Sequence, residues 1–225
     1  MKKILLAGLA ISWFLVQSAS ATTINWTDWQ SATTGAVTGS IGGVTVNYTG
    51  DYAFAQLGTG INYWTEPVAG AEPYTGNSVI DNAPTPAEMI ALDVSATHKI
   101  TFSEALLNPV MAIVSMGQPG WPVSYNFDQS FSLLSNGVGY WSGANGWVPG
   151  SYTILGNTLT GNEMHSVIQF NGPVDTIQWT STPNEYWHGI TVGSPASVPE
   201  PATMFLFGTG LVGLIGTNLR RRKED

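Results

Sequence analysis

The stretch Val110-Met-Ala-Ile-Val-Ser-Met116 is apolar at every position except the serine, and it carries no charge. A short apolar run without alternation is typical of a strand that is buried on both faces. Asn108-Pro109 precedes the run and Gly117 follows it, so turn residues bound it at both ends. We therefore predict that residues 110–116 form a central strand, with the rest of the domain built around it.

Short segments rich in Val, Ile, Thr and aromatic residues recur on both sides of this run, separated by Gly, Pro, Asn and Ser. In residues 44–48 Val and Tyr alternate with Thr and Asn, a pattern typical of a strand with one buried face. Residues 85–88 could cap a helix, but the apolar run after them is too short for one and indicates a strand. The predicted strands are 44–48, 89–92, 100–102, 110–116, 124–127, 131–134, 152–155, 167–170, 176–179 and 190–192. Many short strands without helices predict an all-β fold, an antiparallel two-sheet sandwich of jelly-roll type.

Two features of composition refine this prediction. Residues 66–86 contain four prolines among Gly, Ala and Asn, which predicts a long surface loop or lid. The chain has no cysteine, so the fold must be stabilised by burial alone, and thiol catalysis and thiolate metal sites are excluded.

The N-terminus has the three parts of a secretory signal peptide. Met1 is followed by two lysines, residues 4–16 are apolar, and Ala19-Ser20-Ala21 provides the small-residue cleavage pattern around Ala19 and Ala21. The apolar run is too short for a retained anchor to be favoured. We expect residues 1–21 to be removed, which makes Thr22 the first mature residue.

The C-terminus predicts a membrane anchor. Residues 202–219 are free of charge, and eighteen helical residues extend about 27 Å, close to the hydrocarbon thickness of a bilayer. The cluster Arg220, Arg221, Arg222 and Lys223 should hold the tail, residues 220–225, in the cytoplasm. Residues 193–201 are small and polar and contain prolines, which indicates a linker. Residues 22–192 are then the β-sandwich ectodomain outside the membrane.

The order of Pro199-Glu200-Pro201, an apolar span and an arginine cluster resembles the PEP-CTERM sorting signal of Gram-negative bacteria. The resemblance implies recognition and cutting by exosortase, an integral-membrane protease or transpeptidase, and an association with exopolysaccharide production. The acidic end, Glu224-Asp225, departs from the usual pattern. An ordinary tail anchor is the alternative. Segments between residues 100 and 193 also resemble a β-sandwich domain found ahead of such tails, which supports the fold but implies no activity.

The charge of the outer domain excludes a polyanion-binding surface. Residues 22–197 contain one basic residue, Lys99, and twelve acidic residues, a formal balance of −11. Affinity for nucleic acid comes mainly from Lys and Arg that neutralise phosphates, which one lysine cannot supply. We therefore expect no nucleic-acid partner.

Tryptophans outside the alternating segments suggest a possible saccharide-stacking surface, because the apolar face of a sugar ring packs against an indole. Three of them lie in segments rich in Gly, Pro, Ser and Asn, and the fourth precedes a histidine. The four residues are Trp121, Trp141, Trp147 and Trp187. Alternatively, these side chains pack in the core and against loops, and so stabilise a domain without disulfides.

Acidic residues give weaker indications of chemistry. A glycoside hydrolase needs two acids that face each other across a cleft, and Glu163, Glu185 and Asp128 are candidates that the sequence alone cannot bring together. Glu163 and Glu185 also pair in sequence with His165 and His188 at spacings that could serve a metal, but two scattered pairs more often indicate ordinary histidines. We therefore expect no catalytic residue, no metal and no cofactor.

These expectations together describe a non-enzymatic, exported protein. It would be anchored in the inner membrane by its C-terminal helix, in contact with membrane lipid, and then sorted by an exosortase-type protease to the cell surface or extracellular matrix. A sandwich that binds exopolysaccharide is the alternative, and a polysaccharide-active hydrolase is a third, less favoured one.

Overall fold

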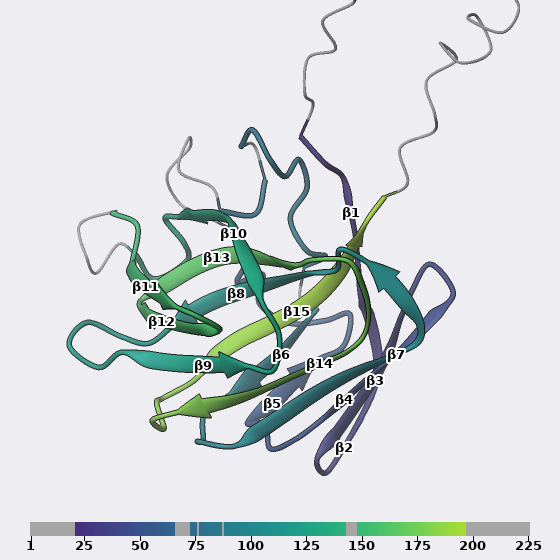
Figure 1. Ribbon diagram of the computed structural model, residues 1–225. Helices are drawn as coiled ribbons and strands as arrows, with labels where there is room; N and C mark the ends of the chain where they lie inside the picture. Colours follow the sequence, from purple (N-terminus) through teal and green to yellow (C-terminus); the bar gives the residue numbers. More distant parts are fainter. Residues whose placement is uncertain (1–20, 66–72, 76, 87, 143–147, 197–225) are drawn as a thin grey trace, which may run out of the picture.

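The computed structural model of the chain describes residues 21–65, 73–75, 77–86, 88–142 and 148–196. These residues form strands, turns and bends, and the strands make two sheets that pack face to face (Figure 1). Neighbouring strands in both sheets run antiparallel. The predicted all-β, antiparallel two-sheet sandwich is therefore confirmed.

The first sheet has seven strands in the order β10-β13-β8-β15-β6-β5, with β1 paired to β15. Its strands are β1 (Ile24–Trp26), β5 (Phe54–Gln56), β6 (Met89–Leu92), β8 (Val110–Met116), β10 (Phe131–Gly137), β13 (Met164–Phe170) and β15 (His188–Pro195).

The second sheet has eight strands in the order β11-β12-β9-β14-β7-β4-β3-β2. Its strands are β2 (Asp28–Thr33), β3 (Ala36–Ile41), β4 (Val44–Thr49), β7 (Thr97–Leu107), β9 (Val123–Phe127), β11 (Ser151–Leu155), β12 (Thr158–Asn162) and β14 (Pro173–Thr182). The chain changes sheet between β1 and β2 and between β4 and β5, then at every step from β6 to β11 and again at every step from β12 to β15. The resulting orders β6-β15-β8-β13 and β7-β14-β9-β12 are those of a jelly roll.

Strand β8 has the central position that its apolar sequence predicts. It lies between β13 and β15, and all seven of its residues are buried. Successive side chains point to opposite faces, so Met111 and Ile113 join the core between the sheets, whereas Ala112 and Val114 join a second apolar cluster on the outer face of the first sheet.

The segment between β5 and β6 covers that outer face. Trp64, Tyr74 and Ile80 are at most 1% exposed, and the Tyr74 hydroxyl donates to the carbonyl of Ile113 at 2.6 Å. Within the predicted loop 66–86, Tyr74 and Ile80 are thus packed against the sheet, whereas Ser78, Val79, Asp81, Thr85 and Pro86 are exposed. The expectation of a surface loop is therefore wrong at these two buried positions, where large apolar side chains cover the sheet.

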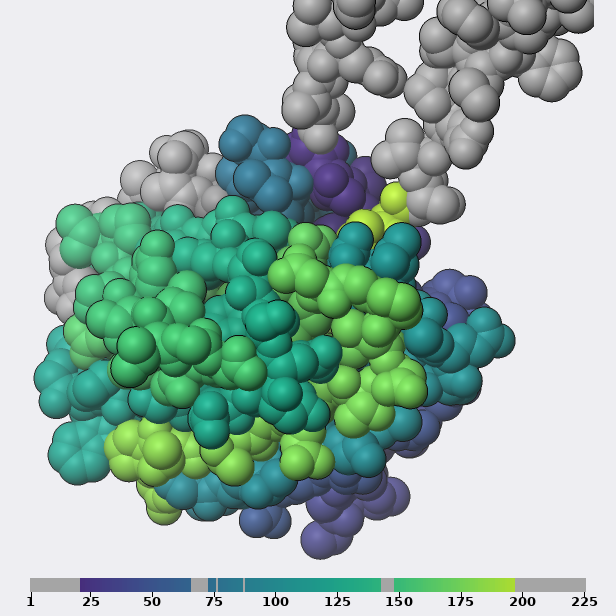
Figure 2. Space-filling view, viewed as in Figure 1, coloured from purple at the N-terminus to yellow at the C-terminus, as the bar shows by residue number. Residues whose placement is uncertain are grey.

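Both ends of the domain lie side by side, at the purple and yellow ends of the described chain in Figures 1 and 2. Strand β1 pairs with the last residues of β15, Ile24 opposite Pro195, and the Ala196 N–H donates to the Thr23 carbonyl at 2.8 Å. This pairing extends β15 three residues into the predicted linker 193–201. Thr22 is already held to the domain, since its N–H donates to the Val79 carbonyl at 2.7 Å.

Several predicted segments lie outside the described residues. These are residues 1–20 of the signal peptide, including Ala19, and the C-terminal Pro199-Glu200-Pro201 motif, apolar span and basic cluster. Within the part of the chain that the structure describes, no helix is long and apolar enough to span a membrane.

Candidate functional site

A pocket of about 290 Å³ lies at one end of the sandwich. The jelly-roll order brings several segments together at this end. They are the end of β8, the β8–β9 turn, the start of β13, and the loops before β11 and β15. The residues that line it are Ser115, Gly117, Gln118, Pro119, Trp141, Glu163, Glu185, Tyr186 and Trp187. Two acids and two tryptophans that the sequence singled out separately therefore share one pocket.

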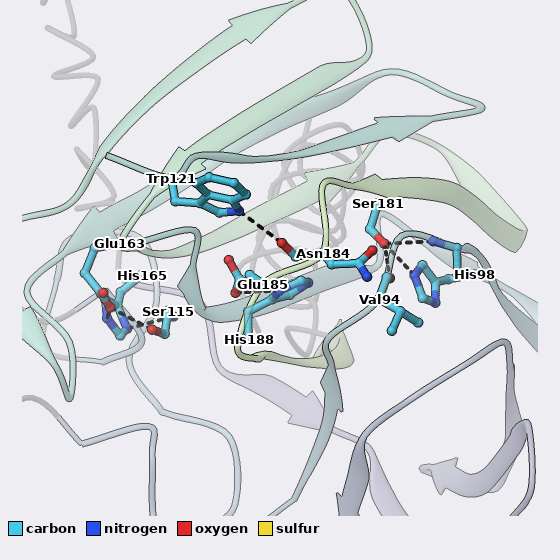
Figure 3. Close-up of polar contacts among 11 residues, drawn as sticks. Val94, His98, Ser115, Trp121, Glu163, His165, Ser181, Asn184, Glu185 and His188 are labelled. Carbon is cyan, nitrogen blue, oxygen red and sulfur yellow. Dashed lines mark hydrogen bonds and ion pairs between the residues drawn. The ribbon is translucent and has the colours of Figure 1, made fainter. Parts of the chain in front are cut away.

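Glu163 is held by two neighbours (Figure 3). Ser115 Oγ donates to Glu163 Oε1 at 2.7 Å, and His165 Nε2 lies 3.2 Å from the same oxygen. The Ser115 backbone N–H donates to His165 Nδ1 at 3.4 Å, so Nδ1 is the acceptor and Nε2 carries the proton that is donated to Glu163. Both contacts end on Oε1, which leaves Glu163 Oε2 without a partner among the described residues.

The backbone is specialised where Ser115 and Glu163 meet. Ser115 has φ 58° and Glu163 has φ 59°, in the left-handed region that residues with a Cβ seldom adopt. Strand β8 has one extra residue opposite His165, a β-bulge that turns the Ser115 side chain toward the pocket. Gly117, also at positive φ, approaches the Gly161 carbonyl so closely that a Cβ could not fit. The apolar β8 thus ends in an irregular segment that presents one polar side chain.

Glu185 is positioned by the loop between β14 and β15. Its N–H donates to the Asp93 carbonyl at 2.9 Å, and the Ser95 N–H donates to Asn184 Oδ1 at 2.7 Å, so the loop is fixed to the β6–β7 turn. His188 Nδ1 lies 2.7 Å from Glu185 Oε1. The Glu185 side chain is only 3% exposed, and its Oε2 is buried without a partner among the described residues.

The second ring nitrogen of His188, which does not contact Glu185, also lacks a partner in the described part of the chain. His188 Nε2 is buried without a hydrogen bond among the described residues, and so is the Tyr125 hydroxyl, whose ring centroid lies 5.2 Å from that of His188. Burial raises the pKa of Tyr125 well above its ordinary value. The Glu185–His188 pair therefore leads from the pocket to two buried polar atoms that are not hydrogen-bonded to each other.

Trp141 and Trp187 line the pocket and belong to a group of five aromatic rings in mutual contact, which we call the aromatic cluster. Trp141 and Trp187 meet edge to face, with centroids 5.0 Å apart and planes at 82°. Tyr63 stacks on Trp141 at 5.1 Å and contacts Trp187 at 5.0 Å. The cluster consists of Phe54, Tyr63, Tyr140, Trp141 and Trp187. Such mutually braced rings present a rigid apolar surface.

Not all of the predicted saccharide-stacking residues line this pocket. Trp121 lies on the β8–β9 turn, 52% exposed, and its indole N–H donates to the Asn184 carbonyl at 3.0 Å (Figure 3). Tyr186, which the sequence did not single out, lines the pocket and is 86% exposed. Trp147 lies outside the described residues.

The other candidates lie apart from the pocket. Asp128 follows the far end of β9 and hydrogen-bonds to Gln178. His98 is buried between Tyr48 and Ser181, with both ring nitrogens 2.8 Å from their hydroxyls, and burial lowers its pKa to about 4. The described residues contain no group of three or more His, Asp or Glu that could hold a metal ion.

Sequence reasoning missed Ser115, the central link of the site. Its only signal was that it is the single polar residue in an otherwise apolar buried strand. Such a residue needs a partner, and here the partner is Glu163.

Residues 197–223 match the family model of the PEP-CTERM protein-sorting motif. The match includes Pro199-Glu200-Pro201 and the arginine cluster, and it ends just before Glu224. No curated protein and no solved structure matches the chain. The predicted sorting signal is therefore confirmed, and it begins two residues after the end of β15. This motif implies export and processing by exosortase, a membrane protease.

Proposed function

We propose that the chain is a non-enzymatic surface or extracellular-matrix protein, delivered by its signal peptide and sorted through the PEP-CTERM motif. In this proposal residues 202–219 span the inner membrane in contact with lipid, residues 220–225 stay in the cytoplasm, and exosortase releases or transfers the domain near Pro199-Glu200-Pro201. The observation that carries the proposal is the match at residues 197–223.

Two features at the ends of the domain support it. Thr22, the residue after the predicted signal cleavage, is the first of the described residues for which a hydrogen bond to the fold is seen, so cleavage there would keep the hydrogen bonds described for the sandwich. The last strand residue, Pro195, lies just before the motif, so cutting near residue 200 would free a folded domain with few extra residues.

Intact mass spectrometry of the protein from its native host tests the sorting. Membrane and matrix fractions are compared for the wild type and for Glu200→Ala. We expect a wild-type mass from Thr22 to the region 199–201 in the matrix fraction, and a Glu200→Ala mass that reaches Asp225 in the membrane fraction. Glu224→Ala is the matched control, because it removes an acid just beyond the matched residues and should be trimmed normally. Trimming of Glu200→Ala at the wild-type level would contradict the proposal.

A carbohydrate-binding sandwich, with exopolysaccharide as its ligand, is the second candidate. Trp141 and Trp187 beside Glu163 and Glu185 favour it, because stacking rings and carboxylate acceptors suit a polyhydroxylated ligand. Binding on a glycan array that is lost in Trp141→Ala but kept in Trp26→Phe would support it. A polysaccharide hydrolase is less favoured, since both glutamates are held by neighbouring side chains. Hydrolysis by the wild type that is lost in a folded Glu163→Gln protein would be needed to support that reading.

A further inference from the structure

We propose that the pocket at the end of β8 binds a small organic cation that carries an ammonium group. The proposal concerns what the ectodomain recognises and is independent of the sorting mechanism, which can fail without affecting it. Three features of the pocket support it: its negative charge, its unpartnered carboxylate oxygen and the two tryptophans that line it.

The pocket contains two carboxylates, and among the described residues each contacts one histidine but no Lys or Arg. Glu163 and Glu185 both line it, whereas Lys99, the only Lys or Arg of residues 22–197, lies on β7 and does not. His165 does not compensate Glu163, because its Nδ1 accepts the Ser115 N–H and the ring is then the neutral tautomer. A buried carboxylate without a cation is costly, so a positively charged ligand is favoured there over a neutral or anionic one.

Each of the two carboxylates has one oxygen that contacts a histidine and one that accepts no hydrogen bond from the described residues. In each, one oxygen is fixed by a histidine, at 3.2 Å for Glu163 and 2.7 Å for Glu185, and the second oxygen has no partner among the described residues. For Glu185 that second oxygen is fully buried on a side chain only 3% exposed. A rigidly held acceptor that lacks a donor points to a ligand that supplies one.

The aromatic cluster determines what kind of cation fits. Trp141 and Trp187 line the same pocket at nearly perpendicular planes, and indole faces attract ammonium groups through their negative π surface. A bare metal ion would need several oxygen ligands, and the described residues provide no group of three. A volume of about 290 Å³ suits a compact molecule such as a quaternary amine or a single amino sugar.

The test compares each cation with a neutral molecule of the same shape. The full chain is purified in a polyoxyethylene detergent, whose headgroup contains neither sugar nor ammonium, and tryptophan fluorescence is titrated with choline and with its carbon isostere 3,3-dimethylbutan-1-ol. Glucosamine and glucose form the second pair. We expect each cation to bind at least about tenfold more tightly than its neutral analogue, and added salt to weaken the binding.

Three variants locate the interaction. Glu163→Gln and Glu185→Gln should each weaken choline binding about tenfold, since each removes one charge at the ligand. Glu104→Gln removes an equal charge from an exposed position on β7 and should bind choline as the wild type does. Near-ultraviolet circular dichroism verifies that each variant is folded. If the Glu185→Gln protein unfolds, the Glu163→Gln protein still decides the question, because the Glu163 side chain is less deeply buried, 9% exposed against 3%.

Other outcomes would overturn the proposal. Equal binding of choline and its isostere would make the pocket merely apolar, and equal binding of glucose and glucosamine would make it a neutral saccharide site. Absence of any saturable signal with either cation, or full choline binding by folded Glu163→Gln and Glu185→Gln proteins, would also contradict it. None of these results bears on the sorting proposal, because ligand binding is measured on the purified chain before any cutting.

Discussion

Ser115 and Glu163, 48 positions apart in sequence, both have a left-handed backbone, and the serine Oγ donates to the glutamate Oε1 at 2.7 Å. Left-handed residues with a Cβ cost about 1–2 kcal/mol each, so two of them in contact indicate that the surrounding packing imposes this geometry. Two of the three non-glycine residues with positive φ among the described residues therefore meet in this pocket.

The strain at Ser115 predicts a difference between two substitutions. Ser115→Ala keeps the backbone strain and removes the hydrogen bond, so the free energy of unfolding should fall by about 1–3 kcal/mol. Ser115→Gly removes the same bond but adopts positive φ without a steric cost, so it should be about 1 kcal/mol more stable than Ser115→Ala. Urea unfolding measures both. A glycine variant that is less stable than the alanine variant would contradict the assigned strain.

Gly139 predicts a coupling between the loop before β11 and the Glu163 site. A Cβ at this position would overlap the ring of His165 at Nδ1. Gly139→Ala should therefore displace the imidazole from Glu163 and lower the free energy of unfolding by about 1–3 kcal/mol. In a double-mutant cycle His165→Ala should cost less in the Gly139→Ala background than in the wild type, because the displaced ring has already lost its contacts. Strictly additive costs would show that the two residues do not interact.

His98 predicts a pH dependence of stability. Burial lowers its folded-state pKa from 6.5 to about 4, so between these values only the unfolded chain binds the proton. The contribution to stability is complete above pH 6.5, is lost as the pH falls, and levels off below about 4, with a total of about 3 kcal/mol. Urea unfolding at pH 7 and pH 4.5 for the wild type and His98→Gln checks this. The wild type should lose more stability than the variant, and equal losses would rule out His98 as the source.

Strand β11 predicts self-association. It is an edge strand with all five residues exposed, it contains no charge, and its pairing with β12 has no bulge. Such an edge can pair with another chain. Ile154→Lys should reduce light scattering during refolding with little change in stability. Leu107→Lys, which alters an exposed apolar residue at the end of β7, should not. Equal reductions by both variants would assign the effect to net charge alone.

The strands that could be predicted from the sequence are those with enough large apolar side chains to indicate which residues are buried. The run 110–116 is apolar on both faces and became the central strand β8, and each of the other predicted ranges falls within a strand. Strands β3 and β12 were not foreseen, because Ala, Gly, Ser and Thr dominate them and cross-strand pairing, rather than residue preference, makes them extended. Strands β1, β2 and β5 were missed as well.

The site was predictable only as separate residues. Glu163, Glu185, Trp141 and Trp187 were each identified from composition and spacing, but their meeting depends on three loops that the jelly-roll order brings to one end. Neither the bulge that turns Ser115 nor the contact of the β14–β15 loop with Asp93 has a local signal. Long-range topology, which a single sequence does not reveal, determines both.

Strand β15 connects the two functional ends of the molecule. It begins at His188, beside the pocket, and ends seven residues later at Pro195, about 23 Å away and two residues before the sorting motif. Along that length it is bonded to β8 on one side and to β6 and β1 on the other. A mechanical pull on the tail would therefore load many hydrogen bonds in shear at once, rather than peel off an edge strand one bond at a time. The domain thus joins the sorting tail through an interior strand, whose opposite end lies beside the pocket.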